Sequence, residues 1–91
     1  VDHNISKAGL WMLTQVSALS LGGDNIRVNA VLPGPVMKSP DMTDEFWHKI
    51  GANLPLKRTG NEDDVARAVV YLAGENFITG TLLTVNGGET I

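Results

Sequence analysis

The sequence predicts an α/β fold built on a parallel sheet. Two short runs rich in β-branched and aliphatic residues, at 26–32 and 78–85, are separated by two helical segments rather than by a tight turn. The last residues of the first run are apolar on both faces, as expected of a strand that is covered on both sides. Strands joined by a helical crossover pair in parallel, so the two runs are expected to be parallel strands.

The first helix is expected over 6–21, because this stretch has no proline and few β-branched residues. No residue between Leu10 and Leu21 is charged, and the apolar residues lie all around the helix. Such a helix needs cover on more than one side, which a chain of 91 residues hardly offers. We therefore expect further sequence or a partner subunit against it. Gly22 or Gly23 is expected to end it in a left-handed conformation.

A strand over 26–32 is expected next, followed by a proline-rich loop over 33–42. Asn29, inside the strand, is expected to have a structural role. A short helix is expected over 43–54, with Thr43 as its N-cap and acidic residues in its first turn. The order of helix, strand, loop with helix, helix and strand is that of the final part of a larger domain, since two strands alone do not make a parallel sheet.

The clearest helix is expected to end at Gly74. Either Thr59, with Glu62 at capping-box spacing, or Asn61 directly is expected to cap its start. Its buried face is marked by apolar residues at i, i+3, i+4 and i+7, which are Val65, Ala68, Val69 and Leu72. The last strand runs into a double glycine, and Asn86 before it is interpreted as a turn residue.

The composition sets several classes of function aside. A net charge of −3 with scattered basic residues gives no basic surface for nucleic acid. There is no cysteine, and His48 has no partner at metal-ligand spacing, so we expect no metal site. The apolar stretches are shorter than the roughly 20 residues that span a bilayer. No membrane association is expected, and without a signal-peptide pattern the expected location is the cytoplasm.

Four segments in matching order and spacing resemble the C-terminal part of the short-chain dehydrogenase/reductase family. They are "SKAGLWMLTQVSALSL", "IRVNAVLPGPV", "PLKRTGNEDDVARAVVYLAG" and "ITGTLLTVNGG". The resemblance implies a doubly wound Rossmann-type parallel sheet that holds NAD or NADP. Family members usually have about 250 residues. Residues 1–91 then correspond to the C-terminal part of a single domain, without the glycine-rich dinucleotide-binding part near its N-terminus.

The family's catalytic motif is a tyrosine followed four residues later by a lysine. Lys7 matches the lysine, which the resemblance implies holds the nicotinamide ribose and lowers the pKa of the tyrosine. His3 stands at the tyrosine position, because the only tyrosine, Tyr71, lies in a later helix. Three explanations compete: the protein lacks the acid, His3 donates the proton instead, or the start of the chain is altered. A surface histidine without function is the plain alternative.

Pro33, Gly34 and Val36 match the family loop whose backbone contacts the nicotinamide carboxamide. Without that role the same residues form a Pro-Gly turn that ends a strand. Lys38 stands where the family commonly has threonine. Residues 41–54 correspond to the family's variable substrate-binding segment. Its apolar side chains either close over a substrate or only bury the helix, and they are Met42, Phe46, Trp47 and Ile50.

The function these features imply is an NAD(P)-dependent oxidoreductase that transfers hydride between nicotinamide and a carbonyl or alcohol carbon of a small molecule. A homodimer or homotetramer is expected. The alternative is a catalytically inactive homologue that serves as a binding or oligomerisation subunit, and His3 and Lys38 favour it. Residues 1–91 alone are expected to be inactive, because they contain no loop for the dinucleotide phosphates.

Overall fold

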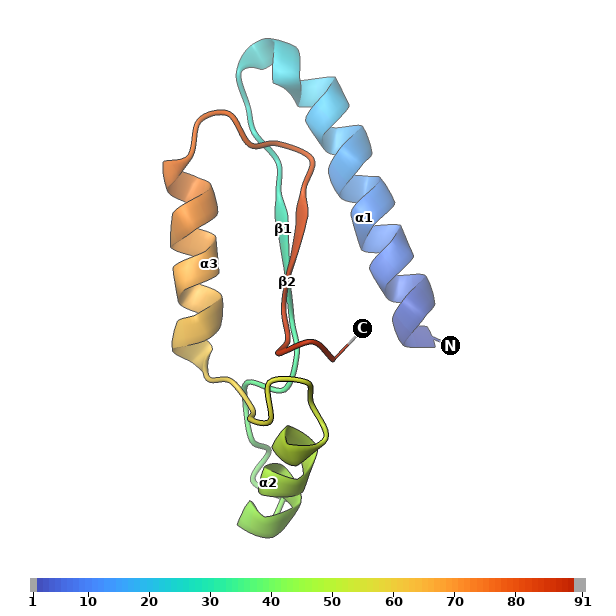
Figure 1. The fold of residues 1–91 in the computed structure, drawn as a ribbon. Helices are drawn as coiled ribbons and strands as arrows, with labels where there is room; N and C mark the ends of the chain where they lie inside the picture. Colours follow the sequence, from blue (N-terminus) through green and yellow to red (C-terminus); the bar gives the residue numbers. More distant parts are fainter. Residues whose placement is uncertain (1, 90–91) are drawn as a thin grey trace.

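The computed structural model describes the backbone of residues 2–89 and the side chains of residues 5–89. Three α-helices and two strands make up this part of the chain (Figure 1). In chain order they are α1 (Asp2–Leu21), a 3-10 turn (Gly22–Asp24), β1 (Ala30–Pro33), α2 (Asp44–Ala52), α3 (Glu62–Gly74) and β2 (Leu82–Val85). The elements follow the order that the sequence predicts.

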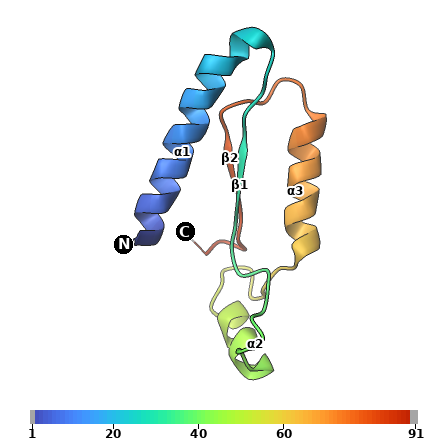
Figure 2. The same ribbon diagram turned by 180° about the vertical axis from the view of Figure 1, so that it is seen from behind.

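The two strands form a parallel pair, with Ala30 opposite Leu82 and Pro33 opposite Val85. Helix α1 covers one face of this pair and α3 covers the other, as the two opposite views show (Figures 1 and 2). Helix α2 lies beyond the carboxyl ends of both strands. The structure therefore confirms the α/β fold with a parallel sheet and a helix on each face, which is the doubly wound arrangement.

Side-chain hydrogen bonds extend the contact between the strands upstream of the ladder. Asn29 Nδ2 donates to Ile78 O at 2.9 Å, and Asn29 Oδ1 accepts from the Thr81 backbone N–H at 3.0 Å. The Val28 backbone N–H donates to Thr79 Oγ1 at 3.0 Å. The first strand is thus shorter than the predicted 26–32, because side chains replace the regular backbone ladder there. The structural role expected of Asn29 is confirmed.

The prediction that Gly22 or Gly23 ends the first helix in a left-handed conformation is wrong. The chain instead tightens into the 3-10 turn, and Asn25 adopts the left-handed conformation with φ of 60°. The Asn25 N–H donates to Gly22 O at 2.9 Å, which satisfies a carbonyl at the helix end. Asparagine tolerates this conformation better than other residues with a side chain.

Arg27, which lies far from α3 in the sequence, caps the C-terminal end of that helix. Its Nη1 donates to Leu72 O at 2.8 Å and its Nη2 donates to Ala73 O at 3.1 Å. The last carbonyls of a helix have no partner within it, and a cation there also complements the helix dipole. Helix α3 ends at Gly74 as predicted. Two of its last carbonyls accept hydrogen bonds from Arg27, which lies just before β1 in the chain.

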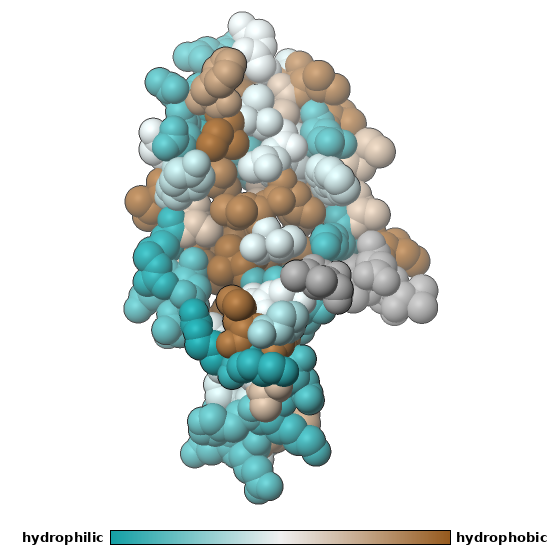
Figure 3. All heavy atoms as spheres, in the orientation of Figure 1, coloured by the Kyte–Doolittle hydropathy of each residue, from teal (hydrophilic) through white to brown (hydrophobic). Residues whose placement is uncertain are grey.

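The apolar faces of the helices are covered only in part. Among the described residues the buried apolar side chains are Ala18, Leu54 and Leu72. On the predicted buried face of α3, Val69 stays 49% exposed. The outer side of α1 leaves large apolar side chains exposed, of which Leu19 is 85% exposed. Apolar residues accordingly gather on the visible surface over the sheet and its helices (Figure 3).

No helix within residues 2–89 combines the length and the apolar character that crossing a membrane requires.

Replacing Asn29 with alanine should destabilise the intact protein by about 1–3 kcal/mol, because the change leaves Ile78 O and the Thr81 N–H without their partner. Asn76→Ala is the matched control, since Asn76 is exposed and makes no hydrogen bond within the described range. Urea denaturation of the three proteins measures the difference. Equal midpoints for Asn29→Ala and Asn76→Ala would contradict the role given to Asn29.

Candidate active site

The carboxyl edge of the strand pair is the place where functional groups gather. Both strands end there, and α1 and α3 both begin at that end (Figures 1 and 2). In parallel sheets, ligands bind outside the carboxyl ends of the strands. The start of a helix adds backbone N–H groups and a partial positive charge, which favour polar or anionic ligand groups.

Lys7 lies in the second turn of α1 and is half-buried. Since α1 starts at the carboxyl edge, Lys7 lies toward that end of the sheet. His3 belongs to the first turn of the same helix, and a spacing of four residues puts the two positions on one helix face. The side chain of His3 is outside the described residues, so its predicted role stays a prediction.

The loop after β1 is held tightly to its surroundings. The Gly34 N–H donates to Val85 O at 2.9 Å, and Pro35 O accepts from the Gly60 N–H at 3.0 Å. A Cβ atom on Gly34 would lie only 2.5 Å from Asn86 Cβ, so a side chain cannot be placed there without moving the turn that follows β2. This close approach explains the glycine in the Pro-Gly sequence and fixes the course of the loop.

Val36 follows on this loop and is half-buried. Its backbone N–H and carbonyl form no hydrogen bond with any other described residue. Both groups are therefore available to a ligand that offers a donor and an acceptor together, as a primary carboxamide does. Pro33, the last residue of β1, is exposed at the same edge.

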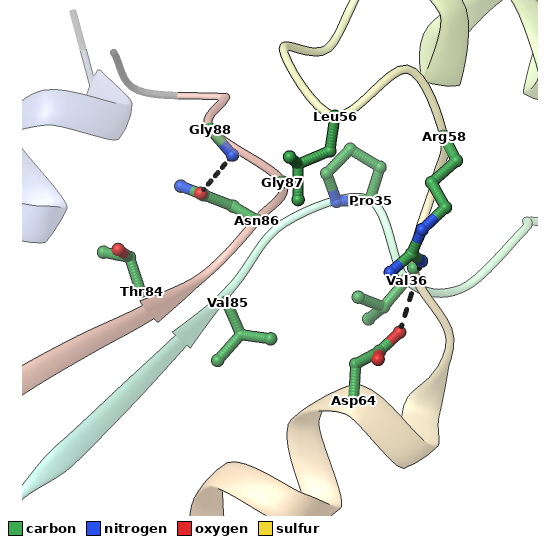
Figure 4. Close-up of a pocket in the computed structure, with 11 residues that line it drawn as sticks. Pro35, Val36, Leu56, Arg58, Asp64, Thr84, Val85, Asn86, Gly87 and Gly88 are labelled. Atoms are coloured by element: carbon green, nitrogen blue, oxygen red, sulfur yellow. Dashed lines mark hydrogen bonds and ion pairs between the residues drawn. The ribbon is translucent and has the colours of Figure 1, made fainter.

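A pocket of about 480 Å³ lies where the loop, the α2–α3 connection, the start of α3 and the end of β2 meet (Figure 4). It is lined by Pro35, Val36, Leu56, Arg58, Gly60, Asp64, Thr84, Val85, Asn86, Gly87 and Gly88. Val36 is the one predicted site residue in this lining. Lys7, Pro33 and Gly34 lie at the same edge of the sheet without lining the pocket.

The double glycine after β2 forms one wall of the pocket. Gly87 and Gly88 have φ of 62° and 91°, and the Gly88 N–H donates to Asn86 Oδ1 at 3.1 Å. A Cβ on Gly88 would lie 2.7 Å from Pro55 Cγ. The predicted turn role of Asn86 is confirmed. The contribution of this turn to a pocket was not predictable from the sequence, because it depends on the contact between Gly88 and Pro55, which are far apart in the chain.

Asp64 is the carboxylate of the pocket and the partner of Asn61 in a capping box. The Asn61 N–H donates to Asp64 Oδ2 at 2.8 Å, and the Asp64 N–H donates to Asn61 Oδ1 at 3.2 Å. Of the two predicted caps, the structure selects Asn61 rather than Thr59. The hydrogen bond from the Asn61 backbone, together with the Arg67 and Arg58 guanidinium groups, lowers the pKa of Asp64.

Arg58 gives the pocket a cationic side chain that the sequence argument did not single out. Its Nη1 lies 3.9 Å from Asp64 Oδ2 and donates to Thr59 O at 3.3 Å, while Arg67 forms an ion pair with the other Asp64 oxygen. Two guanidinium groups thus face one carboxylate, of which Arg58 and Asp64 line the pocket and Arg67 does not. The adjacent Lys57 and Arg58 were the only sequence signal for it.

Metal-ligating side chains do not gather in the part of the chain whose side chains are described: residues 5–89 contain no group of three His, Asp or Glu placed to hold an ion. His48 lies on α2, with its Nδ1 at 2.8 Å from Asp44 O one turn earlier.

Comparison with known proteins decides the family. The family model described as enoyl-(acyl carrier protein) reductase matches residues 2–90. A 7alpha-hydroxysteroid dehydrogenase of Clostridium sardiniense is 40% identical over 93 residues, covering 97% of this chain and 36% of that protein. A (3R)-3-hydroxyacyl-CoA dehydrogenase of Mus musculus is 41% identical, covering 96% of this chain and 35% of that protein.

The chain belongs to the short-chain dehydrogenase/reductase family. Solved structures agree. FolM alternative dihydrofolate reductase 1 from Brucella suis, in complex with NADP, superposes with a TM-score of 0.80 at 34% identity, covering 93% of this chain and 34% of that one. A small-chain dehydrogenase in complex with NADPH gives 0.77 at 30% identity, covering 89% of this chain and 39% of that one.

The short-chain dehydrogenase/reductase relatives are longer than this chain, which spans about a third of the length of the curated proteins it matches. Their names describe different substrates, a hydroxysteroid and a hydroxyacyl-CoA, so the family does not by itself fix a substrate.

The capping box predicts an acid-sensitive contribution to stability. The folded-state pKa of Asp64 lies below its ordinary value of 3.8, so the stabilisation is present above about pH 4 and is lost as the pH falls through the lower, folded-state pKa. Between about pH 6 and about pH 3, the free energy of unfolding should therefore fall less in Asp64→Asn than in the wild type. Asp63→Asn is the control, because Asp63 has no ion pair with a described residue. Identical pH profiles for wild type and Asp64→Asn would contradict this prediction.

Proposed function

We propose that residues 1–91 are the C-terminal part of a single Rossmann-type domain, and that the whole protein is an NAD(P)-dependent oxidoreductase. Its reaction would be hydride transfer between nicotinamide and a carbonyl or alcohol carbon of a small molecule. One observation carries the proposal. The loop at Pro33–Val36 leaves the backbone of Val36 free at the edge where α1 begins, and Lys7 lies near the start of that helix.

The residues of this chain suit one end of a dinucleotide. The free N–H and carbonyl of Val36 match the acceptor and donor of the nicotinamide carboxamide. The Lys7 ammonium, on the helix that borders the same edge, is the group expected to hold the nicotinamide ribose. The cofactor, when bound, supplies or accepts the hydride. The hydrogen bond from the Gly34 N–H and its close approach to Asn86 keep the loop in place, which would help to orient a bound nicotinamide ring.

The relatives support the cofactor class. One structural neighbour is a complex with NADP and another is a complex with NADPH. A relative from Azotobacter vinelandii, 40% identical over 89 residues, is named an L-rhamnose 1-dehydrogenase (NAD(P)(+)). We extend this cofactor class to the whole protein without choosing between NAD and NADP. A cytoplasmic location and assembly into a homodimer or homotetramer complete the proposal, the latter because α1 exposes a wide apolar surface.

A catalytically inactive homologue is the second candidate, and the residue at position 3 favours it. Tyrosine holds this place in the family motif, and an imidazole is shorter than a phenol, so its proton reaches less far toward a substrate carbonyl. Such a protein would keep the cofactor loop and the apolar surface of α1 and would act as a binding or oligomerisation subunit.

Lys7→Met in the whole protein should lower nicotinamide-dependent turnover roughly 100-fold or more, since it removes the charge that positions the ribose and assists the acid. Lys49→Met is the control, because Lys49 is an exposed residue of α2 with no ion pair to a described residue. The rates are measured from the change in cofactor absorbance, with a panel of small alcohols and carbonyl compounds as substrates. Unchanged turnover in Lys7→Met would contradict the role of Lys7.

His3→Tyr distinguishes the two candidates. If the protein lacks a proton donor because His3 replaces the family tyrosine, restoring the tyrosine should raise turnover at least about ten-fold. Cofactor binding, measured by fluorescence titration in the same preparations, should stay the same in wild type and variant. A fall in turnover on this substitution would instead show that His3 itself donates the proton.

A further inference from the structure

Helix α2 is attached very differently at its two ends. At the C-terminal end Gly51 is buried, and a Cβ there would lie 2.8 Å from the Thr59 backbone nitrogen. Leu54, just beyond the helix, is also buried, and the Leu56 N–H donates to Gly87 O at 3.1 Å. This end is therefore packed backbone to backbone against the segment that leads into α3.

Within the described residues, one ion pair joins the first residue of α2 to the loop after β1. Lys38 Nζ lies 3.5 Å from Asp44 Oδ1, and Asp44 is the first residue of the helix. The Lys38 side chain is 32% exposed, whereas that of Asp44 is 88% exposed. Lys38 follows Val36 by two residues on the loop that Pro35 O and the Gly60 N–H fix in place. The ion pair thus joins a loop that is anchored at Pro35 to the end of α2 that has few other contacts.

The rest of α2 makes little contact with the sheet or its covering helices. The helix projects beyond the carboxyl edge (Figures 1 and 2), and its lobe stands apart in the space-filling view (Figure 3). The apolar side chain of Phe46 is exposed. Elements with few buried apolar contacts open at low free-energy cost.

We propose that the Lys38–Asp44 ion pair is a latch, and that it sets how often the N-terminal end of α2 moves away from the loop while Gly51 and Leu54 act as the hinge. The proposal rests on the proposed function in one respect only: the helix would enclose a small carbonyl or alcohol substrate at the carboxyl edge. The lysine that replaces the family's threonine then acts on the motion of α2 rather than on the cofactor carboxamide.

The latch is weak, as a device that must open repeatedly requires. An exposed ion pair changes an equilibrium by up to about five-fold, and salt screens it. The amide hydrogens of Met42, between the paired residues, and of Phe46 and Trp47, in the first turn of α2, report its opening. The Met42 N–H donates to Ser39 O at 3.0 Å, and the Trp47 N–H donates to Thr43 O at 3.1 Å.

The test is hydrogen–deuterium exchange at Met42, Phe46 and Trp47 in the whole protein at low ionic strength. Lys38→Gln and Asp44→Asn should each speed exchange about two- to five-fold, and the double variant should exchange no faster than either single one. Added salt should speed exchange in the wild type and abolish the differences between the proteins.

Glu45→Gln is the matched control. Glu45 lies beside Asp44 in the same first turn, near the positive end of the helix dipole, but it has no ion pair with a described residue. Equal exchange in Glu45→Gln and Asp44→Asn, or additive effects in the double variant, would overturn the latch. A protein that binds no nicotinamide dinucleotide would sink the proposed function but leave this exchange result standing, so the two failures are distinguishable.

Discussion

The parallel pairing of β1 with β2 is the constraint on which the rest of the structure depends. Parallel strands end at the same edge of a sheet, and the helices that cross over them must begin near that edge. The pairing therefore brings the Pro33–Val36 loop, the double glycine after β2 and the start of α3 together, although they are far apart in the sequence. The pocket exists because these three segments meet the α2–α3 connection.

Close backbone approaches make this meeting rigid. At Gly34, Gly51 and Gly88 a Cβ would lie within 3.0 Å of a neighbouring segment, and each glycine joins a different pair of segments. The loop after β1 touches the end of β2, α2 touches the entry to α3, and the double glycine touches the α2–α3 connection. Such contacts allow little adjustment, so the carboxyl edge is fixed except at the loosely held end of α2.

Much of this fold could be predicted from local sequence patterns. Thr43 was expected to cap α2, and its side chain accepts from the Phe46 N–H. The α/β class and the order of elements followed from periodicity and from the absence of a tight hairpin turn. These features depend on neighbours in the chain, which is why a pattern of a few residues is enough to predict them.

The features that escaped prediction depend on distant residues. The bonds from Arg27 to the end of α3 and the pocket position of Arg58 arise only when separate segments pack together. The left-handed residue after α1 is Asn25 because the helix tightens into a 3-10 turn first. In the site, Val36 was found from its motif, whereas the freedom of its backbone groups became visible only in the folded loop.

The most direct test of the central claim is a hydrogen-exchange footprint of NADPH, and of NADH in parallel, on the whole protein. We expect protection of the amides at 34–37 when a cofactor binds. We expect no change at the opposite, amino end of the strands, around 22–27 and 76–79. Protection confined to that opposite end, or none anywhere in the chain with either cofactor at saturating concentration, would contradict it.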